Sequence, residues 1–451
     1  MNNSYNSFFR NSDLKVNRYF AQPQFKSQLI EASKHGKDVF YNEVRKLNNC
    51  YYARKLQGDI SIKDIFLEYW SAFKEKYMHR LKRPGLIESI ETMIGCHNFD
   101  NGYLFYECPN CNDFYMIGFS CHSRFCSSCG QKYKNQRTIK VSEKCLNVPH
   151  RQLVFTIPSQ LRPYFQVHHS LLDVLFNSVK ETLNACLEKN APKLYKNEKR
   201  KLGFISFLHT FGRDLKFHPH IHVLIAERYY KNNGDLKCFN FFPYEYLRIT
   251  FQNKLFHNIY IHCRDAIKNK KLSQELFKLC THLKELYPRG YYFYGPQINK
   301  DKTTINDIKS LTNYIARYAS HPAISERRIS SINFENNTVT WFYDPHEDDD
   351  ITDESLKKGR QEITESVFDF MAKLIKHIPD KGFQQIRYYG FYSNKFLNKI
   401  STNKLFSNAQ LNKMLDNTYW VNGLKLSFGY NPTLCKCGSQ MMINLDLSYF
   451  P

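Results

Sequence analysis

The stretch of residues 203–227 constrains the fold most, because its pattern predicts a β-hairpin with histidines along one face. Its first half is β-branched and aromatic, the tetrapeptide at 213–216 is polar enough to turn, and an apolar run follows. His220 and His222 are two residues apart in the second strand, so both rings project from the same face. A turn centred in the tetrapeptide places His209 directly across from His220, with its side chain on that face.

Three imidazoles that converge at such a separation can hold one divalent metal ion. A single histidine on a strand is ordinarily a half-buried polar residue, and a His-x-His pair can arise by chance among 17 histidines. Four histidines within fourteen residues of a predicted hairpin are harder to ascribe to chance. We therefore predict that His220 and His222 bind a divalent metal ion, with His209 as the third ligand. Asp214 and His218 are the alternatives for the third position.

Residues 208–225, LHTFGRDLKFHPHIHVLI, resemble the central motif of the insertion sequence ninety-one family of transposases. The family belongs to the His-hydrophobic-His (HUH) class of single-strand DNA nucleases, in which paired histidines bind a divalent metal ion and a tyrosine attacks DNA. His220 and His222 fall on the paired positions. The resemblance implies that the ion is Mg²⁺ or Mn²⁺. It also implies an α+β fold, with the histidines on an antiparallel sheet, helices packed on that sheet and the tyrosine helix across the site.

Residues 307–329 carry an apolar stripe at helical spacing, with two tyrosines on or beside it. Tyr314 and Tyr318 are four residues apart, so they lie on one face of the predicted helix. Considered alone, tyrosines in such a stripe are core residues more often than nucleophiles. The segment YIARYASHPAISERRI, however, resembles the Tyr-x-x-x-Tyr helix of the family and the segment that follows it. The resemblance implies that both tyrosines are nucleophiles, and it leaves the order of their attack open.

The reaction is also implied by the resemblance. Each tyrosine would form a 5′-phosphotyrosine bond and release a free 3′-hydroxyl, which keeps the energy of the phosphodiester for rejoining. Two tyrosines allow two strands to be held at once, which suits rolling-circle transposition of an insertion sequence. The implied partner is single-stranded DNA at the transposon ends and at the target.

Two Cys-x-x-Cys pairs, CPNC at 108–111 and CSSC at 126–129, are separated by fourteen residues. Each pair lets two thiolates bind one tetrahedral ion, and the intervening loop can bring the second pair to the first. A redox role is a weaker explanation for two pairs so close together. The family has a zinc-binding domain here, with a pattern similar to SCHSRFCSSC at 120–129. We predict a small Cys₄ module with one structural Zn²⁺ held by Cys108, Cys111, Cys126 and Cys129.

Other cysteines leave alternatives open. Cys121 can replace one of the paired cysteines, and Cys96 with His97 can serve a second ion. The tail carries CKCG at 435–438, where relatives often carry Cys-x-x-Cys-Gly. Because this spacing is shortened, we do not count the tail segment as a metal site.

The chain has 451 residues and a formal net charge of +22, which argues for a polyanionic partner. No stretch approaches eighteen apolar residues and the N-terminus has no apolar signal core, so neither membrane insertion nor export is expected. We therefore expect a DNA-associated protein of the bacterial cytoplasm. Fourteen cysteines in such a chain indicate metal ligands and reduced thiols rather than disulfides. The sequence does not specify an oligomeric state.

Two clusters of basic residues are candidates for contact with the DNA backbone. One follows the second cysteine pair, and the other lies just before the hairpin, where a solvated loop is an equally good explanation. Aromatic residues around the cysteines suit base stacking. The predicted DNA-binding residues are Lys132, Lys134, Arg137, Lys199, Arg200 and Lys201.

Four segments are predicted: an N-terminal extension at 1–58, a helical lead-in with the zinc-binding DNA-binding domain at 59–150, the two-tyrosine catalytic domain at 151–395, and a tail at 396–451. Two other functions remain as alternatives. A rolling-circle replication initiator or relaxase would use the same chemistry in a different biological setting. A non-catalytic zinc-ribbon protein that binds nucleic acid would need neither the histidines nor the tyrosines.

Overall fold

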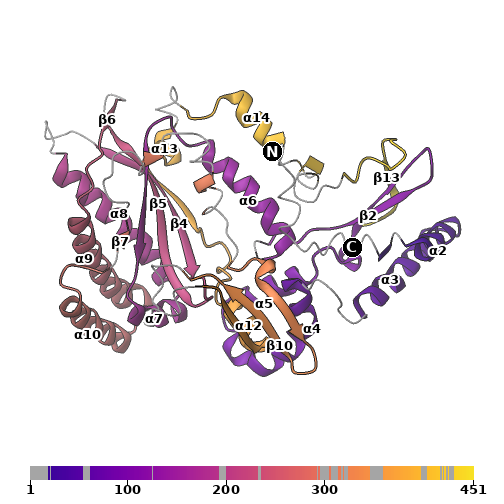
Figure 1. Ribbon diagram of the computed structural model, residues 1–451, viewed down its shortest axis with the longest axis horizontal. Helices are drawn as coiled ribbons and strands as arrows, with labels where there is room; N and C mark the ends of the chain where they lie inside the picture. The colour runs from indigo at the N-terminus through magenta and orange to yellow at the C-terminus, as the bar shows by residue number, and fades with distance from the viewer. Residues whose placement is uncertain are drawn as a thin grey trace. The chain divides into compact units, whose positions relative to one another are not determined.

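The computed structural model divides the chain into two compact units, whose elements are labelled in Figure 1. Unit 1 comprises Met1–Arg137, Pro322–Lys381 and Asn412–Pro451, and unit 2 comprises Thr138–His321 and Gly382–Leu411. The structure describes residues 19–20, 22–53, 61–123, 125–191, 200–231, 235–291, 293–294, 304–305, 313–315, 318, 323–345, 359–397, 404–416, 419, 421–422, 425 and 431–451.

Unit 2 is built on an antiparallel sheet of seven strands. The strands run in the order β12-β4-β5-β3-β7, while β6 pairs with β5 and β8 pairs with β3. Their bounds are β3 His150–Thr156, β4 Lys201–Phe211, β5 Phe217–Tyr230, β6 Leu236–Cys238, β7 Phe293–Tyr294, β8 Thr304–Ile305 and β12 Ile386–Gly390.

The two longest strands, β4 and β5, form the predicted hairpin, because their β-branched and aromatic residues favour extended backbone. Three features close the turn between them. The amide of Gly212 donates to the carbonyl of Lys216 at 3.1 Å, and Asp214 Oδ1 accepts from the amide of Lys216 at 3.0 Å. Leu215 adopts the left-handed conformation with φ +61°, which reverses the chain. The turn therefore lies where the polar tetrapeptide predicted it.

Strand alternation sorts the residues of this sheet onto two faces. One face carries Phe204, Leu208 and Val223 into a large core with the helices α7 Arg162–Val167, α8 Leu171–Asn190, α9 Tyr244–His262 and α10 Lys270–Leu286. Figure 1 shows α8, α9 and α10 together beside β4 and β5. The other face carries Ile205, Phe207 and Leu224 into a second core, whose other members include Val141, Tyr314, Ile315, Phe391 and Tyr392. The predicted α+β fold, an antiparallel sheet with packed helices, is confirmed.

Unit 1 contains two small antiparallel sheets, in the orders β13-β1-β2 and β11-β10-β9. The strands are β1 Tyr103–Glu107, β2 Phe114–Gly118, β9 Ile329–Asn333, β10 Thr338–Tyr343, β11 Gln361–Ser366 and β13 Met442–Tyr449. The helices are α2 Pro23–Lys34, α3 Lys37–Ala53, α4 Ile62–Tyr77, α5 Leu86–Ile94 and α12 Val367–Ile375. The remaining helices are α6 Ser127–Ser142 and α14 Asn408–Asp416, which cross the unit boundaries, and α13 Asn394–Leu397 in unit 2.

The first described residues of the chain belong to the core of unit 1. Phe40 and Leu47 of α3 are buried in one cluster with Phe105 and Phe114 of the β1–β2 hairpin. Leu447 of β13 is partly buried against the same cluster. Residues that the sequence presented as an N-terminal extension and a C-terminal tail therefore share a core.

This division differs from the predicted segments, and unit 2 begins at Thr138 rather than at residue 151. The predicted catalytic segment 151–395 is not continuous, because residues 322–381 belong to unit 1 and contribute β9–β11 and α12. The predicted tail is divided as well, because unit 2 ends at Leu411. The packing of α12 against α4 decides the place of residues 322–381, and the pairing of β13 with β1 decides the division of the tail. Local periodicity carries no signal for contacts between such distant segments. Within the described ranges, no helix has the length and apolar character needed to cross a membrane.

Candidate functional site

Three histidines converge on one face of the unit 2 sheet. The helices α8, α9 and α10 pack on the other face. The β4–β5 register pairs His209 with His220 and Phe207 with His222, so the predicted register is confirmed. The ring centroids lie 5.5 Å apart for His209 and His220, and 4.9 Å apart for each of the other two pairs. One nitrogen from each ring lies within 4.8 Å of the others, which is close enough for a shared ion.

Hydrogen bonds orient two of these rings. His220 Nδ1 donates to the carbonyl of His218 at 2.8 Å, which directs Nε2 toward the cluster, as a backbone carbonyl often does for a metal-binding histidine. His209 Nε2 donates to the carbonyl of Tyr318 at 3.1 Å. Among the described residues, nothing hydrogen-bonds Nδ1 of the buried His222. A buried nitrogen left open beside two other imidazoles fits a metal ion.

The protonation of these rings also suits metal binding. Burial lowers the pKa of His220 to about 4, and Arg162 contributes to the shift. Burial, with His220 and His209 nearby, also lowers the pKa of His222 well below its ordinary value. Neutral imidazole is the form that binds metal, so at neutral pH both rings can accept an ion without losing a proton.

The two alternatives for the third ligand are engaged elsewhere. His218 Nε2 lies 2.7 Å from Thr156 Oγ1 and accepts from Arg162 Nη2 at 3.1 Å. Asp214 accepts from Lys216 in the hairpin turn. Neither belongs to the group of converging ligand atoms, so His209 completes the trio.

The paired tyrosines lie beside the histidines. The ring of Tyr318 is centred 3.9 Å from the ring of His222 and 5.6 Å from that of His209. The ring of Tyr314 is 4.6 Å from that of Tyr318 and packs against Phe207. Residues 313–315 and 318 are helical, and residues 307–312, 316–317 and 319–322 of the predicted segment lie outside the described residues. Tyr318 is thus the tyrosine in contact with the histidines, and Tyr314 is the more deeply buried one.

The cysteines form two separate clusters, and this corrects the predicted single zinc site. The pair Cys126 and Cys129 meets Cys96 and Cys121, with Sγ–Sγ distances of 3.6 Å from Cys129 to each of the latter two. The pair Cys108 and Cys111 instead meets two cysteines of the tail, Cys435 and Cys437. His97 is not one of the converging ligands, but its side chain hydrogen-bonds Cys129, and its Nδ1 contacts the carbonyl of Gly118 at 2.8 Å.

The β1–β2 hairpin explains why the two pairs cannot share an ion. Cys108 and Cys111 lie in its turn, whereas Cys96 precedes β1 and Cys121 follows β2. A five-residue strand such as β2 is roughly 17 Å long, so the two clusters lie at opposite ends of the hairpin. The sequence did contain a signal, because Cys96, Cys121 and the tail cysteines bring the total in the region to eight, enough for two tetrahedral sites.

The cluster of Cys96, Cys121, Cys126 and Cys129 has the geometry of a tetrahedral zinc site. Four sulfurs at about 2.3 Å from one ion lie roughly 3.8 Å from each other, close to the separations found here. Burial and contacts among the four sulfurs also perturb the thiols. Hydrogen bonding with Cys121 is the largest of the effects that raise the pKa of Cys96 and lower that of Cys129. A cation at the centre would stabilise the thiolate forms of all four.

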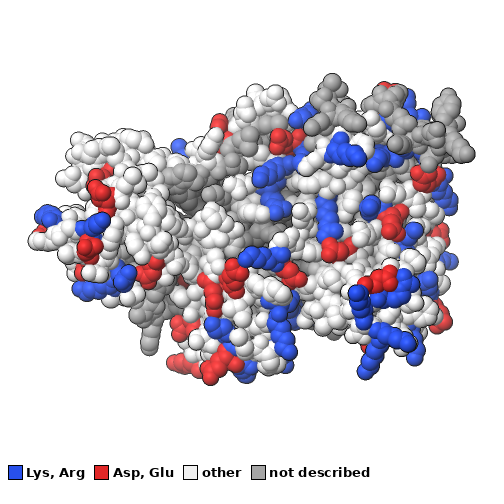
Figure 2. Space-filling model, turned by 180° about the vertical axis from the view of Figure 1, so that it is seen from behind, with Lys and Arg blue, Asp and Glu red and all other residues white. Residues whose placement is uncertain are grey.

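The predicted DNA-binding residues differ in their burial and in their contacts. Arg200 is buried and its guanidinium donates to Glu188 at 2.9 Å, which disfavours its predicted contact with DNA. Lys201 is half-buried, with Nζ 4.2 Å from the centre of the Phe396 ring. Arg137 donates to the hydroxyl of Tyr133 and stacks on its ring, and burial lowers the pKa of Lys134. The side chains of Lys132 and Lys199 lie outside the described atoms. Figure 2 shows Lys and Arg side chains over much of one face, with acidic residues among them.

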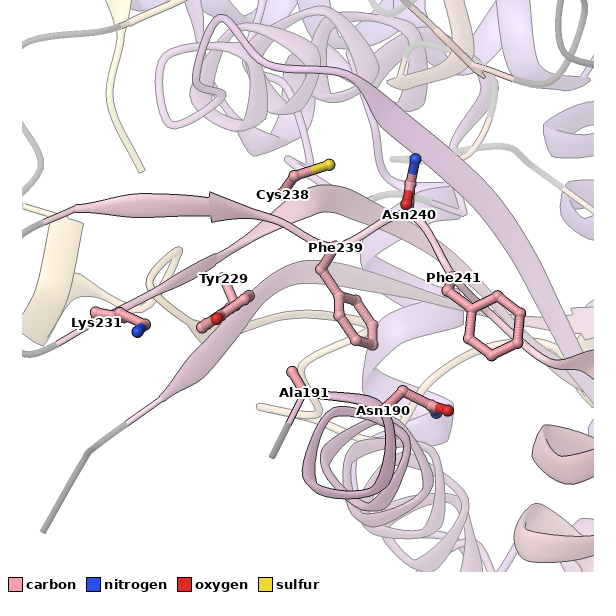
Figure 3. A pocket seen from close by; sticks show the side chains of 8 residues that line it. All are labelled: Asn190, Ala191, Tyr229, Lys231, Cys238, Phe239, Asn240 and Phe241. Carbon is pink, nitrogen blue, oxygen red and sulfur yellow. The ribbon is translucent and has the colours of Figure 1, made fainter. Parts of the chain in front are cut away.

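A surface hollow of about 380 Å³ lies at the far end of β5 from the histidines (Figure 3). Its lining includes Tyr229 of β5, Phe239, Phe241 and the end of α8 at Asn190. Seven residues of strand separate Tyr229 from His222, roughly 23 Å, so the hollow is no part of the histidine site.

The sequence is similar to those of known transposases. Residues 203–399 match a family model described as "Putative transposase", and residues 65–157 match a "Transposase zinc-binding domain". The chain is 27% identical over 393 residues to the transposase for insertion sequence element IS801 of Pseudomonas savastanoi pv. phaseolicola, covering 82% of this chain and 87% of that protein. It is 23% identical over 348 residues to the "Putative transposase y4qJ" of Sinorhizobium fredii, covering 74% and 81%. No solved structure is similar enough to count as a match.

Proposed function

Because the chain belongs to the insertion sequence ninety-one family of transposases, we propose that it cuts and rejoins single-stranded DNA at the histidine–tyrosine site of unit 2. One observation carries the proposal: the Tyr318 ring lies 3.9 Å from the His222 ring, within a trio of histidines whose ligand atoms converge. A tyrosine on a cluster of neutral imidazoles is the arrangement that a metal-assisted attack on a phosphodiester requires.

His220, His222 and His209 would hold the divalent ion, either Mg²⁺ or Mn²⁺, although imidazoles also accept softer ions in vitro. When bound, such an ion polarises a non-bridging phosphate oxygen and neutralises the charge that develops in the transition state. The hydrogen bond from His220 Nδ1 to the carbonyl of His218 keeps that ring in position. The two-stranded frame of β4 and β5 fixes the separations of the three rings.

The hydroxyl oxygen of a tyrosine attacks phosphorus, and the bond from phosphorus to the 3′-oxygen breaks. The tyrosine is then joined to the 5′-phosphate, its proton passes to solvent, and the 3′-oxygen leaves as a hydroxyl once it is protonated. Tyrosine has an ordinary pKa of about 10, so the attack depends on a nearby positive charge. The reverse reaction with a new 3′-hydroxyl rejoins the strand without ATP.

Tyr318 makes the first attack in this proposal, because its ring contacts His222 and His209 directly. Tyr314 packs against Tyr318 and Phe207 in the second core, so it reaches the phosphate only after a rearrangement of the helix. Two nucleophiles used in turn would hold two DNA ends during rolling-circle transfer.

The substrate is single-stranded DNA of the element's ends and its target, and the protein acts on it in the bacterial cytoplasm. The net charge of +22 supports contact with the phosphate backbone, and the aromatic content of 16% suits stacking with unpaired bases.

The test is to incubate the full chain with labelled single strands from the element's ends in magnesium, and to map any protein–DNA adduct by mass spectrometry. The expected result is a DNA-linked peptide that contains Tyr318. A first-cleavage adduct on Tyr314 would reverse the proposed order. An adduct outside residues 307–320, or no adduct with any end sequence, would refute the proposed chemistry.

A further inference from the structure

The cluster of Cys108, Cys111, Cys435 and Cys437 joins two parts of the chain that are 329 residues apart. Its tail cysteines lie outside both matched regions, which end at residues 157 and 399. We propose that these four cysteines hold a second structural zinc ion, which fastens the C-terminal strand β13 to the β1–β2 hairpin. The proposal does not depend on the chemistry proposed for unit 2.

The sulfur positions support a shared tetrahedral ion. Cys108 Sγ lies 3.5 Å from Cys437 Sγ, and Cys111 Sγ lies 3.5 Å from Cys435 Sγ, so each short contact joins one hairpin cysteine to one tail cysteine. All four sulfurs lie within 4.8 Å of one another. Tetrahedral coordination at about 2.3 Å requires separations of roughly 3.8 Å, whereas a disulfide requires about 2.05 Å.

The backbone shapes both halves of this site. On the hairpin side, the amide of Cys108 donates to the carbonyl of Asp113 at 2.7 Å, and the amide of Asn112 donates to the carbonyl of Cys108 at 3.0 Å. Asn112 has φ +55°, the left-handed conformation that a tight turn around two ligands needs.

The tail side forms a matching turn. The amide of Cys435 donates to the carbonyl of Ser439 at 2.9 Å, and the amide of Gly438 donates to the carbonyl of Cys435 at 3.0 Å. Gly438 adopts φ +88°, a conformation that only glycine takes readily. This turn brings the two thiols of a Cys-x-Cys segment to one side, which is why the shortened spacing still supplies two ligands.

The surroundings show why an ion is needed here. Among the described residues, the local core has Tyr106, Cys108, Cys435 and Met441 as its buried members. All eight residues of β13 are described, and Ser448 alone is buried, while Met442 and Leu445 are 60% and 67% exposed. Apolar packing of β13 is therefore concentrated at Leu447 and Tyr449, which contact the larger core of unit 1. A metal ion stabilises the other end of the strand, as in other small zinc modules.

The test measures zinc per chain in the full-length protein after purification under reducing conditions. We expect two zinc ions in the unaltered chain and one in the variant Cys435→Ser/Cys437→Ser. The matched control is Cys50→Ser/Cys238→Ser, which removes two exposed cysteines outside both clusters. This control should keep two zinc ions per chain. Tyr318→Phe should also keep two, so failure of the DNA chemistry and failure of this site are distinguishable.

A second measurement covers the case in which the tail variant does not fold. Stepwise titration of the Cys50→Ser/Cys238→Ser chain with a mercurial thiol reagent should release two zinc ions per chain and consume eight thiols as it does so. One zinc per unaltered chain overturns the proposal, as does a tail variant that retains both ions. A disulfide between a hairpin cysteine and a tail cysteine in the reduced protein also overturns it.

Discussion

The histidine site of unit 2 and the cysteine clusters of unit 1 are built in opposite ways. The histidine trio comes from fourteen consecutive residues on two paired strands, inside a sheet with a large core on one face. The second cysteine cluster draws ligands from positions 329 residues apart, around a core of four buried residues. A site of the first kind exists before its ion binds, whereas a site of the second kind depends on its ion for its structure.

This contrast matters for function because the two regions should fail differently. Loss of the histidine chemistry should leave unit 2 folded, since α8, α9 and α10 hold the sheet from the other face. Loss of zinc should unfold the β1–β2 hairpin and release β13, while the unit 2 sheet persists. Four experiments separate these outcomes.

Tyr318→Phe should have the largest effect on catalysis. The substitution removes only the hydroxyl and keeps the ring that packs on His222. Loss of a nucleophile costs on the order of 10⁶-fold in rate, so no adduct should be detectable on the end-derived strand, while circular dichroism and DNA binding remain unchanged. The control is Tyr260→Phe, on the outer surface of α9, which should cleave normally. Cleavage by the Tyr318 variant at the unaltered rate would show that this tyrosine is a packing residue and not the nucleophile.

Chelation of zinc should have the largest effect on structure. Structural zinc contributes about 10 kcal/mol or more of apparent binding free energy to small modules, so its removal should unfold the region around both clusters. Hydrogen exchange on the full chain should then show lost protection for the amides of β1 and β2, with β4 and β5 still protected. Persistent protection in β1 after complete zinc loss would show that the module does not depend on the metal.

His220→Ala should lower the cleavage rate by roughly 10²–10³-fold, because it removes one ligand of the ion that offsets transition-state charge. Binding of single-stranded DNA should be largely retained, since it rests on basic and aromatic surface. His282→Ala, an exposed position on α10, is the control and should cleave normally. A His220 variant that cleaves at the unaltered rate in magnesium would refute the metal assignment.

Arg200→Gln should have the smallest effect, and it should affect stability rather than DNA affinity. The arginine is buried but its partner Glu188 is half-exposed, so the ion pair is worth about 1 kcal/mol in the free energy of unfolding. Chemical denaturation measures this loss, and a salt titration of DNA binding should give the same slope as the unaltered chain. If the slope of the log binding constant against the log salt concentration is smaller by about 1, Arg200 does contact phosphate.

Local patterns in the sequence were sufficient to place the side chains of the proposed catalytic site. The alternation of residues in a strand and a polar turn place His209, His220 and His222 on one face, because strand geometry repeats every two residues. The spacing of Tyr314 and Tyr318 likewise follows from the helical repeat. Each of these relations involves residues that are close in the chain, so the sequence alone determines them.

Only the tertiary structure decided which cysteines share an ion, which tyrosine meets the histidines, and that Arg200 is buried. The pairing of β13 with β1 brings Cys435 and Cys437 to the hairpin turn, and no periodicity near either segment records that pairing. Two Cys-x-x-Cys pairs close in sequence appeared to form one site, but the length of β2 keeps them apart. Local spacing determines which side chains face the same way, whereas the meeting of distant segments depends on packing and strand pairing across the whole chain.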